Sequence, residues 1–249
     1  HAGDMLLSAG TTWVILGLGE KLLYSDSFLA PSIHPVPGLF GAMASLSGTG
    51  VSLEWYRNKF LPEVGFAELD LQAQSREIGD LFYYPYPLGA AYPIWNTNAQ
   101  AAFVGSNLNH DRFDYARAIM EGAAFGVRRA LEDFAVNGCN IGELKVLGGA
   151  SRSPLWTELI CDITNTPVQL LRETDACALG AAMIAACGAG AHADYSAAAT
   201  AMVHRADTLT PSPERAAYYR EKYARYRDCW DHLARSEERR VGKECRSRW

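Results

Sequence analysis

Residues 146–156, with the sequence VLGGASRSPLW, join a short apolar run to a helix start through two adjacent glycines. Ser153 is a favourable N-cap residue, and Pro154 suits the first helical position. Apolar residues then recur at helical spacing at Leu155, Leu159, Ile160 and Ile163. A buried strand that passes directly into an amphipathic helix predicts an α/β architecture, in which helices pack on a sheet.

Gly148 and Gly149 have two interpretations. They are ordinary connection residues, or they let the backbone approach a nucleotide at a helix N-terminus, where free N–H groups favour an anion. The stretch is not a Walker A loop, because no Gly-Lys-Ser/Thr follows, and it lacks the G-x-G-x-x-G spacing of a dinucleotide site. These residues alone leave both interpretations open.

The rest of the second half alternates helices with short apolar strands. Helices are expected over 111–136, from Ser153 onward, and over 175–190, 194–203 and 212–234, with strands over 144–148 and 167–171. In the first half we expect two strands within 5–18, a strand over 38–48, a helix over 51–60 and an irregular segment over 81–96. This order predicts a mixed sheet covered by helices on both faces.

A second turn of interest is Gly10-Thr11-Thr12, between the two strands of residues 5–18. Ligands of such sheets bind beyond the carboxyl ends of strands, and both this turn and Gly148-Gly149 follow a strand. Backbone N–H groups in a glycine and hydroxyl turn can form a concavity that binds anions. A plain hairpin turn is the alternative.

The composition excludes several classes. The net charge of −5 gives no electrostatic reason to expect nucleic acid, and no apolar run is long enough for a membrane span. Six dispersed cysteines and six dispersed histidines form no metal-ligand pattern, so no metal site is expected on the chain. Cys161, Cys177 and Cys187 are expected as reduced core thiols, which favours a cytoplasmic location.

Both ends of the chain differ from its middle. His1 rather than Met begins it, and we expect a chain cut from something longer. Residues 236–249, SEERRVGKECRSRW, carry five basic and three acidic residues without periodicity. We therefore expect one domain over 1–235, and a basic tail over 236–249 that leaves the helix and is disordered or foreign to the domain.

Six segments resemble, in order, the C-terminal lobe of the FGGY family of carbohydrate kinases. They are AGDMLLSAGTTWVI, GVSLEWYRNKF, AYPIWNTNAQAAFVG, ARAIMEGAAFGVR, LGGASRSPLWTELICDITNTPV and ALGAAMIAACGAG, and the resemblance covers about residues 2–234. It implies an actin-like, ribonuclease-H-like fold whose two lobes close on Mg-ATP and a sugar or polyol. The implied reaction is ATP-dependent phosphoryl transfer to a sugar hydroxyl, and a homodimer is compatible with it.

The resemblance also implies which residues meet ATP. Gly10, Thr11 and Thr12 would face its phosphates. Gly148, Gly149 and Ala150 would lie against the adenosine, with Ser153 near the base or ribose. The same resemblance requires an aspartate that accepts the proton of the attacking hydroxyl, in a Gly-x-x-Asp pattern upstream of the phosphate turn.

Asp4 is the only acidic residue near the start, but its spacing to Gly10 is too short for that aspartate. We therefore expect the catalytic aspartate and most sugar contacts on an N-terminal lobe that this chain does not contain. The chain would then be a nucleotide lobe that phosphorylates nothing alone. The face left open by the missing lobe should be unusually apolar.

Two segments depart from the family pattern. The usual Gly-Glu-Arg before Pro-x-Trp is replaced in LGAAYPIW, and the usual Arg-Gly is Gln100-Ala101. These changes leave open a non-catalytic nucleotide-binding module, and another actin-like ATPase is a third alternative.

Several further side chains carry an expectation. Glu121 should make a packing hydrogen bond between helices, and the tyrosines of 218–226 should pack the last helix onto the lobe. Trp95 and Trp156 are expected in the core, and Trp13 is the better candidate for a cleft-lining aromatic. Asp175 should cap the helix that follows it.

Overall fold

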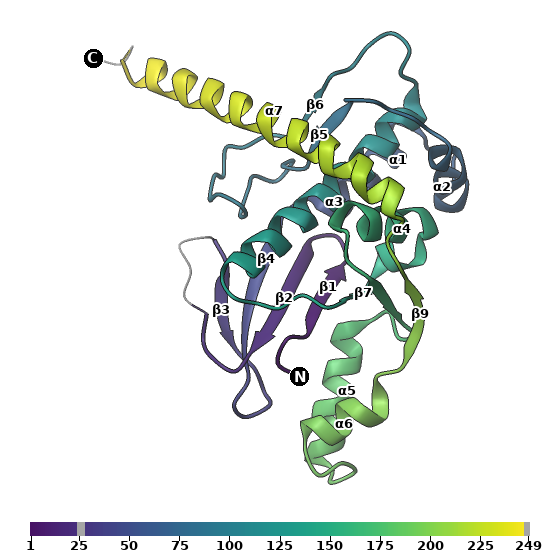
Figure 1. The fold of residues 1–249 in the computed structure, drawn as a ribbon, viewed down its shortest axis with the longest axis vertical. Coiled ribbons are helices and arrows are strands. Elements are labelled where there is room, and N and C mark those ends of the chain that lie inside the picture. Colours follow the sequence, from purple (N-terminus) through teal and green to yellow (C-terminus); the bar gives the residue numbers. More distant parts are fainter. Residues whose placement is uncertain (24–27, 247–249) are drawn as a thin grey trace.

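The chain forms one seven-stranded mixed sheet with helices packed on it, in a computed structural model that describes residues 1–23 and 28–246, and side chains to 233 (Figure 1). The strand order is β3-β4-β2-β1-β7-β8-β9. The central strands β1, β7 and β8 are parallel, and the other pairs are antiparallel. The strands are β1 Met5–Ala9, β2 Trp13–Gly19, β3 Ala30–Ile33, β4 Phe40–Leu46, β7 Leu144–Leu147, β8 Val168–Leu171 and β9 Arg205–Leu209.

The helices lie between and after the strands in the chain. They are α1 Thr49–Phe60, α2 Phe66–Gln74, α3 Arg112–Val136, α4 Pro154–Thr164, α5 Ala176–Gly188, α6 Tyr195–Met202 and α7 Pro213–Arg246, with a 3-10 turn η1 over Gly149–Arg152. The α/β class and the mixed sheet are therefore as expected. Ser153 and Asp175 cap α4 and α5 as predicted, because each side chain accepts a hydrogen bond from the first helical turn.

The core lies between the sheet and α3. In β1 and β2, alternate residues such as Met5, Leu7 and Ile15 are buried, as a period of two requires when one face packs. Most of the α3 residues from Ala116 to Phe134 are buried. The helix packs chiefly on α4, on residues 82–84 and on α1, and makes smaller contacts with β2 and β4. The opposite face of the same strands, including Leu6 and Val14, is only half-buried. Helical cover on that second face is thinner than we expected.

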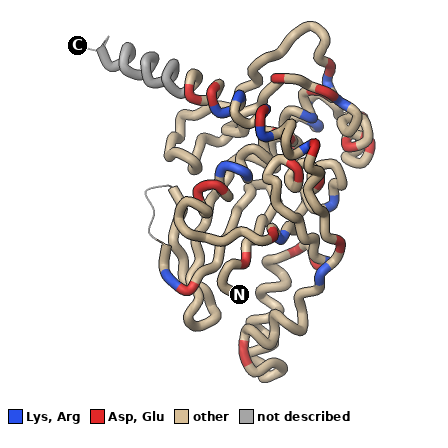
Figure 2. The backbone as a smooth tube through the Cα atoms, viewed as in Figure 1, with Lys and Arg blue, Asp and Glu red and all other residues tan. Residues whose placement is uncertain are grey.

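The helix α5 is apolar but unburied. It carries no charged side chain (Figure 2) and contains no buried residue, and Ile184 is 55% exposed. Its main packing partner is its neighbour α6, at one end of the molecule (Figure 1). The expectation that Cys177 is a core thiol is wrong, since it is exposed, and Cys187 is half-buried, whereas Cys161 is buried. The reason is the same, because α5 packs chiefly on α6 and buries none of its residues.

Three short strands and the end of one helix differ from the sequence expectations. The strand β9 was not predicted, because four of its five residues are exposed and three of those four are polar. The irregular segment 81–96 contains β5 Phe82–Tyr84, which pairs with β6 Ala102–Val104. The helix α7 continues through residues 236–246, which we placed outside it. That run is rich in Glu, Arg and Lys, which favour helix when a helix already precedes them. Residues 247–249 lie outside the described residues.

Candidate functional site

Two turns meet at the carboxyl edge of the central strands. The turn Gly10-Thr11-Thr12 follows β1, and η1 follows β7, its parallel neighbour. Because parallel strands end at the same edge, the two turns lie side by side there. The sequence therefore brings its two candidate segments to one place through the pairing of β1 with β7.

The start of α1 is pressed against the first of these turns. The Val51 N–H donates to the Thr11 carbonyl at 3.0 Å. A Cβ on Gly50 would lie 1.9 Å from the Gly10 carbonyl oxygen, so only glycine permits this approach. The first turn of α1 has no side-chain cap. The helix N-terminus and the turn thus present backbone groups together.

A groove of about 780 Å³ runs between the two turns. This volume is within the range of roughly 300–1,000 Å³ typical of small-molecule sites. Five of the expected nucleotide residues line it, namely Gly10, Thr11, Gly149, Ala150 and Ser153. Thr12 and Gly148 are not among its lining residues. The remaining walls come from α1, α2 and the first turn of α4.

Gly148 and Gly149 have different surroundings. Gly148 has φ +93°, and a Cβ there would lie 2.8 Å from the carbonyl carbon and oxygen of Ala9. Its N–H donates to the Thr174 carbonyl at 3.0 Å. Gly149 has an ordinary φ, and a Cβ there would only approach the Ala9 carbonyl at 3.9 Å. Gly148 is therefore needed for packing against β1, while Gly149 leaves space open in the groove.

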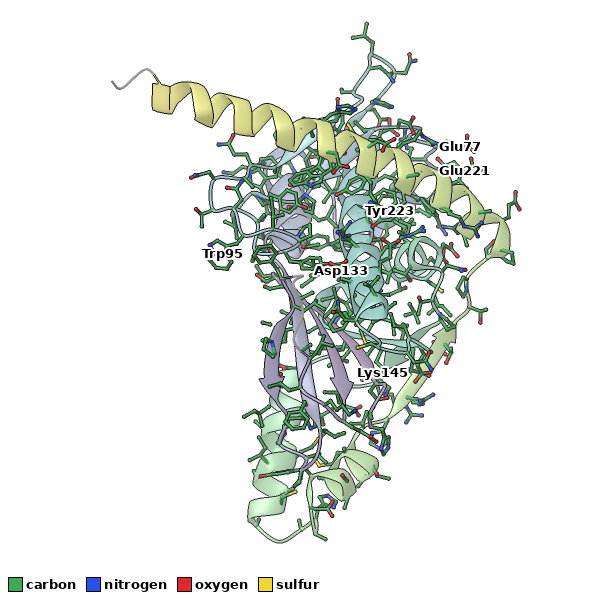
Figure 3. All side chains as sticks on the ribbon, turned by 60° about the vertical axis from the view of Figure 1, so that its left-hand side comes forward. Glu77, Trp95, Asp133, Lys145, Glu221 and Tyr223 are labelled. Atoms are coloured by element: carbon green, nitrogen blue, oxygen red, sulfur yellow. The ribbon has the colours of Figure 1, made fainter. Side chains whose placement is uncertain are left out.

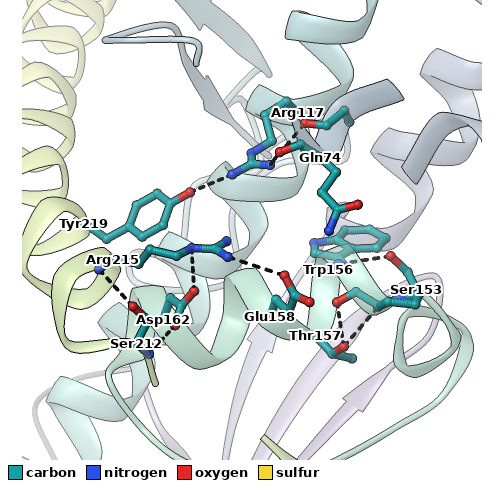
Figure 4. A network of polar contacts seen from close by, with 12 residues as sticks. Gln74, Arg117, Ser153, Trp156, Thr157, Glu158, Asp162, Ser212, Arg215 and Tyr219 are labelled. Atoms are coloured by element: carbon teal, nitrogen blue, oxygen red, sulfur yellow. Dashed lines mark hydrogen bonds and ion pairs between the residues drawn. The ribbon is translucent and has the colours of Figure 1, made fainter. Parts of the chain in front are cut away.

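Ser153 is held by two contacts. Its Oγ accepts a hydrogen bond from the Trp156 N–H at 3.0 Å, as the N-cap of α4 (Figure 4). Its hydroxyl also contacts the carboxylate of Asp70 on α2. Burial raises the pKa of Asp70, and the hydrogen bond to Ser153 opposes that rise. The pair joins the two walls of the groove.

The α2 wall was missed by the sequence analysis. Phe66, Asp70 and Gln74 all line the groove, at positions i, i+4 and i+8 of α2. The regular spacing was visible in the sequence, because residues four apart share one helix face. Nothing local indicated that this face is opposite η1, on the far side of the groove. Figure 4 shows Gln74 and Trp156 near each other in this wall.

The tryptophans do not follow the expectations in every case. Trp13 is fully buried and contacts Trp156 with ring centroids 4.8 Å apart and the rings tilted by 48°, so the prediction that it lines the cleft is wrong. Trp156 is in the core as predicted, since its Nε1 donates to the Met120 carbonyl at 3.1 Å, although one edge of it faces the groove. Trp95 is 69% exposed, so the expectation that it is a core residue is wrong. It lies on a Pro-rich loop that the core does not cover.

Asp4 is far from the groove. It stands immediately before β1, whereas Gly10 follows that strand, and five extended residues separate them. Its carboxylate pairs with Lys145 at 2.6 Å and with the chain's amino group at 2.7 Å. Burial raises its pKa, but these hydrogen bonds and charges bring the net shift below the ordinary value of 3.8. Asp4 is therefore an ion-pair residue at the opposite edge of the sheet.

Two absences concern the described residues. No group of three or more His, Cys, Asp or Glu is placed to hold a metal ion among the residues whose side chains are described, 1–23 and 28–233. Over the same part of the chain, no helix combines the length and apolar character that crossing a membrane requires.

The mixed sheet with its two glycine turns at one edge defines a class, the actin-like ATPase lobes, which solved structures of the same fold share. The chain belongs to the FGGY family of carbohydrate kinases, because residues 5–189 match the C-terminal domain of that family. The resemblance noted from the sequence is thereby confirmed.

Individual relatives agree with this membership. A xylulose kinase of Staphylococcus epidermidis is 28% identical over 229 residues, which are 91% of this chain and 46% of that protein. A ribulokinase of Mycolicibacterium smegmatis is 30% identical over 213 residues, covering 80% of this chain and 38% of that protein. The crystal structure of xylulose kinase from Rhodospirillum rubrum superposes with a TM-score of 0.83 at 30% identity, over 94% of this chain and 48% of that one. The chain spans about half the length of the curated relatives it matches.

Proposed function

We propose that this chain is the nucleotide-binding lobe of a kinase that transfers the terminal phosphoryl group of ATP to a hydroxyl of a sugar or polyol. The observation that carries the proposal is the groove between two glycine turns, in a chain of a carbohydrate kinase family. Relatives named xylulose kinase and ribulokinase make a five-carbon ketose the first acceptor to test.

The groove suggests one orientation of ATP. The phosphates would lie at Gly10 and Thr11, where backbone groups of the turn and the start of α1 favour negative charge. The adenosine would lie along Gly149, where no side chain fills the groove. Phe66 lines the same groove, is 50% exposed and offers a ring face for the base. Phosphoryl transfer depends mainly on such positioning and on charge neutralisation.

Magnesium would belong to the ATP complex. The described residues contain no carboxylate cluster for the ion, so the phosphates would supply most of its oxygen ligands. The Thr11 residue lines the groove, and a hydroxyl is an oxygen donor of the kind that magnesium accepts. When bound, the ion neutralises charge on the phosphates during transfer.

The base that accepts the sugar proton would come from the other half of the kinase. Asp4 lies at the wrong edge of the sheet and is tied to Lys145. We therefore expect this chain to bind ATP without phosphorylating a sugar by itself. The apolar helix α5, which has no buried residue, would pack against that other half.

Calorimetric titration of the chain with Mg-ATP tests the proposal, with Gly149→Val as the decisive variant. Valine at this position would occupy the groove, so binding should be lost. Gly142→Val is the matched control, since a Cβ on Gly142 meets nothing within 4 Å and the residue is exposed outside the groove. Equal binding by both variants would contradict the location of the site.

A non-catalytic nucleotide-binding module is a second candidate. The observation that favours it is the replacement of the Gly-Glu-Arg and Arg-Gly patterns by Gly89-Ala90-Ala91 and Gln100-Ala101. A complete protein that binds ATP but transfers no phosphate to xylulose, ribulose, gluconate or glycerol would support this candidate over the kinase.

A further inference from the structure

A second cavity, of about 230 Å³, lies on another side of the molecule. It is enclosed by the loop of residues 85–94, by α3 and by α7, and the connection from β4 to α1 closes one end. None of its lining residues also lines the nucleotide groove. Figure 3 shows Tyr223 of α7 beside α3, the helix that carries Asp133. The cavity is therefore a separate site in the fold.

Six of the sixteen residues that line this cavity are aromatic. Tyr86 and Trp230 contact each other with ring centroids 4.9 Å apart, and both line the cavity. Tyr92, Phe125, Tyr223 and Tyr226 complete the aromatic lining. Ring faces of this kind pack against the C–H groups of a small carbon skeleton and exclude water from it.

Two arginines, Arg129 and Arg227, and one acidic residue, Asp231, also line the cavity. The Nε of Arg129 is buried and has no hydrogen-bond partner among the described residues. Asp133 lies 3.6 Å from this Nε, and its carboxylate also accepts a hydrogen bond from the Tyr92 hydroxyl. Arg227 is 3.8 Å from Glu132, which the Tyr223 hydroxyl contacts at 3.0 Å. Both guanidinium groups therefore have carboxylate neighbours beyond hydrogen-bond distance.

The buried Nε of Arg129 has lost water without gaining a hydrogen bond, which is costly. The Arg227 side chain is 53% exposed, so its guanidinium keeps contact with solvent. Phosphate oxygens match the planar fork of donors that arginine presents, and two arginines suit a dianion. The cavity is smaller than the roughly 300 Å³ at which drug-sized pockets begin, so its occupant is small.

We propose that this cavity binds a small phosphate monoester, with its phosphate on Arg129 and Arg227 and its carbon skeleton between Tyr86, Tyr92 and Trp230. A pentose phosphate has the required combination of a dianion and a compact body. The site is independent of the nucleotide groove, and the proposal does not depend on kinase activity.

Titration calorimetry with ribose 5-phosphate on the whole chain tests this site. We expect saturable binding, with ribose and inorganic phosphate each binding much more weakly. Arg129→Gln should weaken binding by about tenfold or more, since charged hydrogen bonds are lost. Gly126→Val keeps both arginines but adds a side chain to the cavity wall, and it should also weaken binding. Thermal melting followed by circular dichroism shows whether each variant is folded.

Gly149→Val separates this site from the nucleotide groove, and it should bind ribose 5-phosphate like the unmodified chain. Loss of binding in Gly149→Val would place the ligand in the groove and overturn the proposal. Absence of saturable binding by the unmodified chain, or unchanged binding by folded Arg129→Gln, would overturn it as well. Binding of free ribose as tight as that of ribose 5-phosphate would exclude the role of the two arginines.

Discussion

At the scale of single residues, Gly148 and Gly149 illustrate why adjacent glycines can serve different purposes. Gly148 combines a φ of +93° with backbone contact to Ala9, so its lack of a side chain is a requirement of the fold. Gly149 has neither a positive φ nor a close backbone contact, and its lack of a side chain only leaves the groove open. Stability and ligand binding should therefore separate at this pair.

We predict that Gly148→Ala destabilises the chain by about 1–3 kcal/mol, since it introduces both backbone strain and a clash with β1. Gly149→Ala should change the free energy of unfolding by less than about 1 kcal/mol, because its φ is ordinary and the space is free. Urea denaturation of the two variants beside the unmodified chain measures both values. Equal effects would show that the two positions are equivalent, against the geometry.

At the scale of helices, a buried charged network holds α7 on α3. Glu121 of α3 accepts hydrogen bonds from Arg117 at 2.9 Å and from Lys222 at 2.6 Å, and the Tyr219 hydroxyl joins them (Figure 4 shows Arg117 and Tyr219). All four side chains are at least nine-tenths buried. The expectation that Glu121 makes a packing hydrogen bond is confirmed, but two buried cations share this one carboxylate.

Glu121→Gln should therefore destabilise more than Lys222→Met. The first change leaves two buried cations without a counter-charge, which costs about 3–5 kcal/mol. The second removes one of the two cations, and the Glu121 carboxylate stays paired with the Arg117 guanidinium, so the buried charges balance. Chemical denaturation of both variants gives the order. A larger loss in Lys222→Met would mean that the lysine, rather than the carboxylate, organises the network.

The N-terminus of α3 offers a pH-dependent test. Asp111 accepts from the N–H groups of Phe113 and Asp114 in a capping box. Burial raises its pKa, but these bonds and Arg76 bring the net shift below the ordinary value of 3.8. A carboxylate with a lowered pKa stabilises the fold above the unfolded value, and its contribution is lost as pH falls through the folded value.

We predict that Asp111→Ala costs about 1 kcal/mol at neutral pH, the typical value of an N-cap, and that the difference shrinks below pH 3.8. Denaturant unfolding at several pH values measures this. Asp175→Ala is the matched control, because it removes the cap of α5, a helix that buries nothing. That variant should leave the global unfolding midpoint unchanged.

At the scale of the whole molecule, the uneven burial of the helices is the main feature. The core joins α3, α4 and the aromatic side of α7 to one face of the sheet, while α5 and α6 contact chiefly each other. A helix as apolar as α5 is normally buried inside a protein, but α5 contains no buried residue. This agrees with a chain that spans about half of its relatives.

We predict that amides of α5 exchange with solvent much faster than those of α3, because little packing is lost when α5 opens. Hydrogen exchange followed by mass spectrometry on peptides from 176–188 and 116–134 measures the contrast. Adding the N-terminal half of the Staphylococcus epidermidis xylulose kinase should slow the exchange of α5 if the two halves associate. Equal protection of both helices in the chain alone would contradict the exposed position of α5.

Much of the local structure could be predicted from the sequence. The helix of 111–136 is α3 within one residue, and the strand after it is present. Tyr219, Tyr223 and Tyr226 are buried at helical spacing as expected, whereas Tyr218 is 47% exposed because it lies on another side of α7. The edge strand β9 gave no alternation to detect, since four consecutive residues are exposed and neither of its faces is buried.

The sequence by itself determined the caps, the turns and the periodic faces, because these depend on residues within one or two turns of each other. It also carried the family resemblance, whose segments include both glycine turns. Only the tertiary structure decided that α2 faces η1, that Trp13 is buried and Trp95 is not, and that a second cavity forms between α3 and α7. These features join residues far apart in the chain, and which faces meet is set by the packing of the whole core.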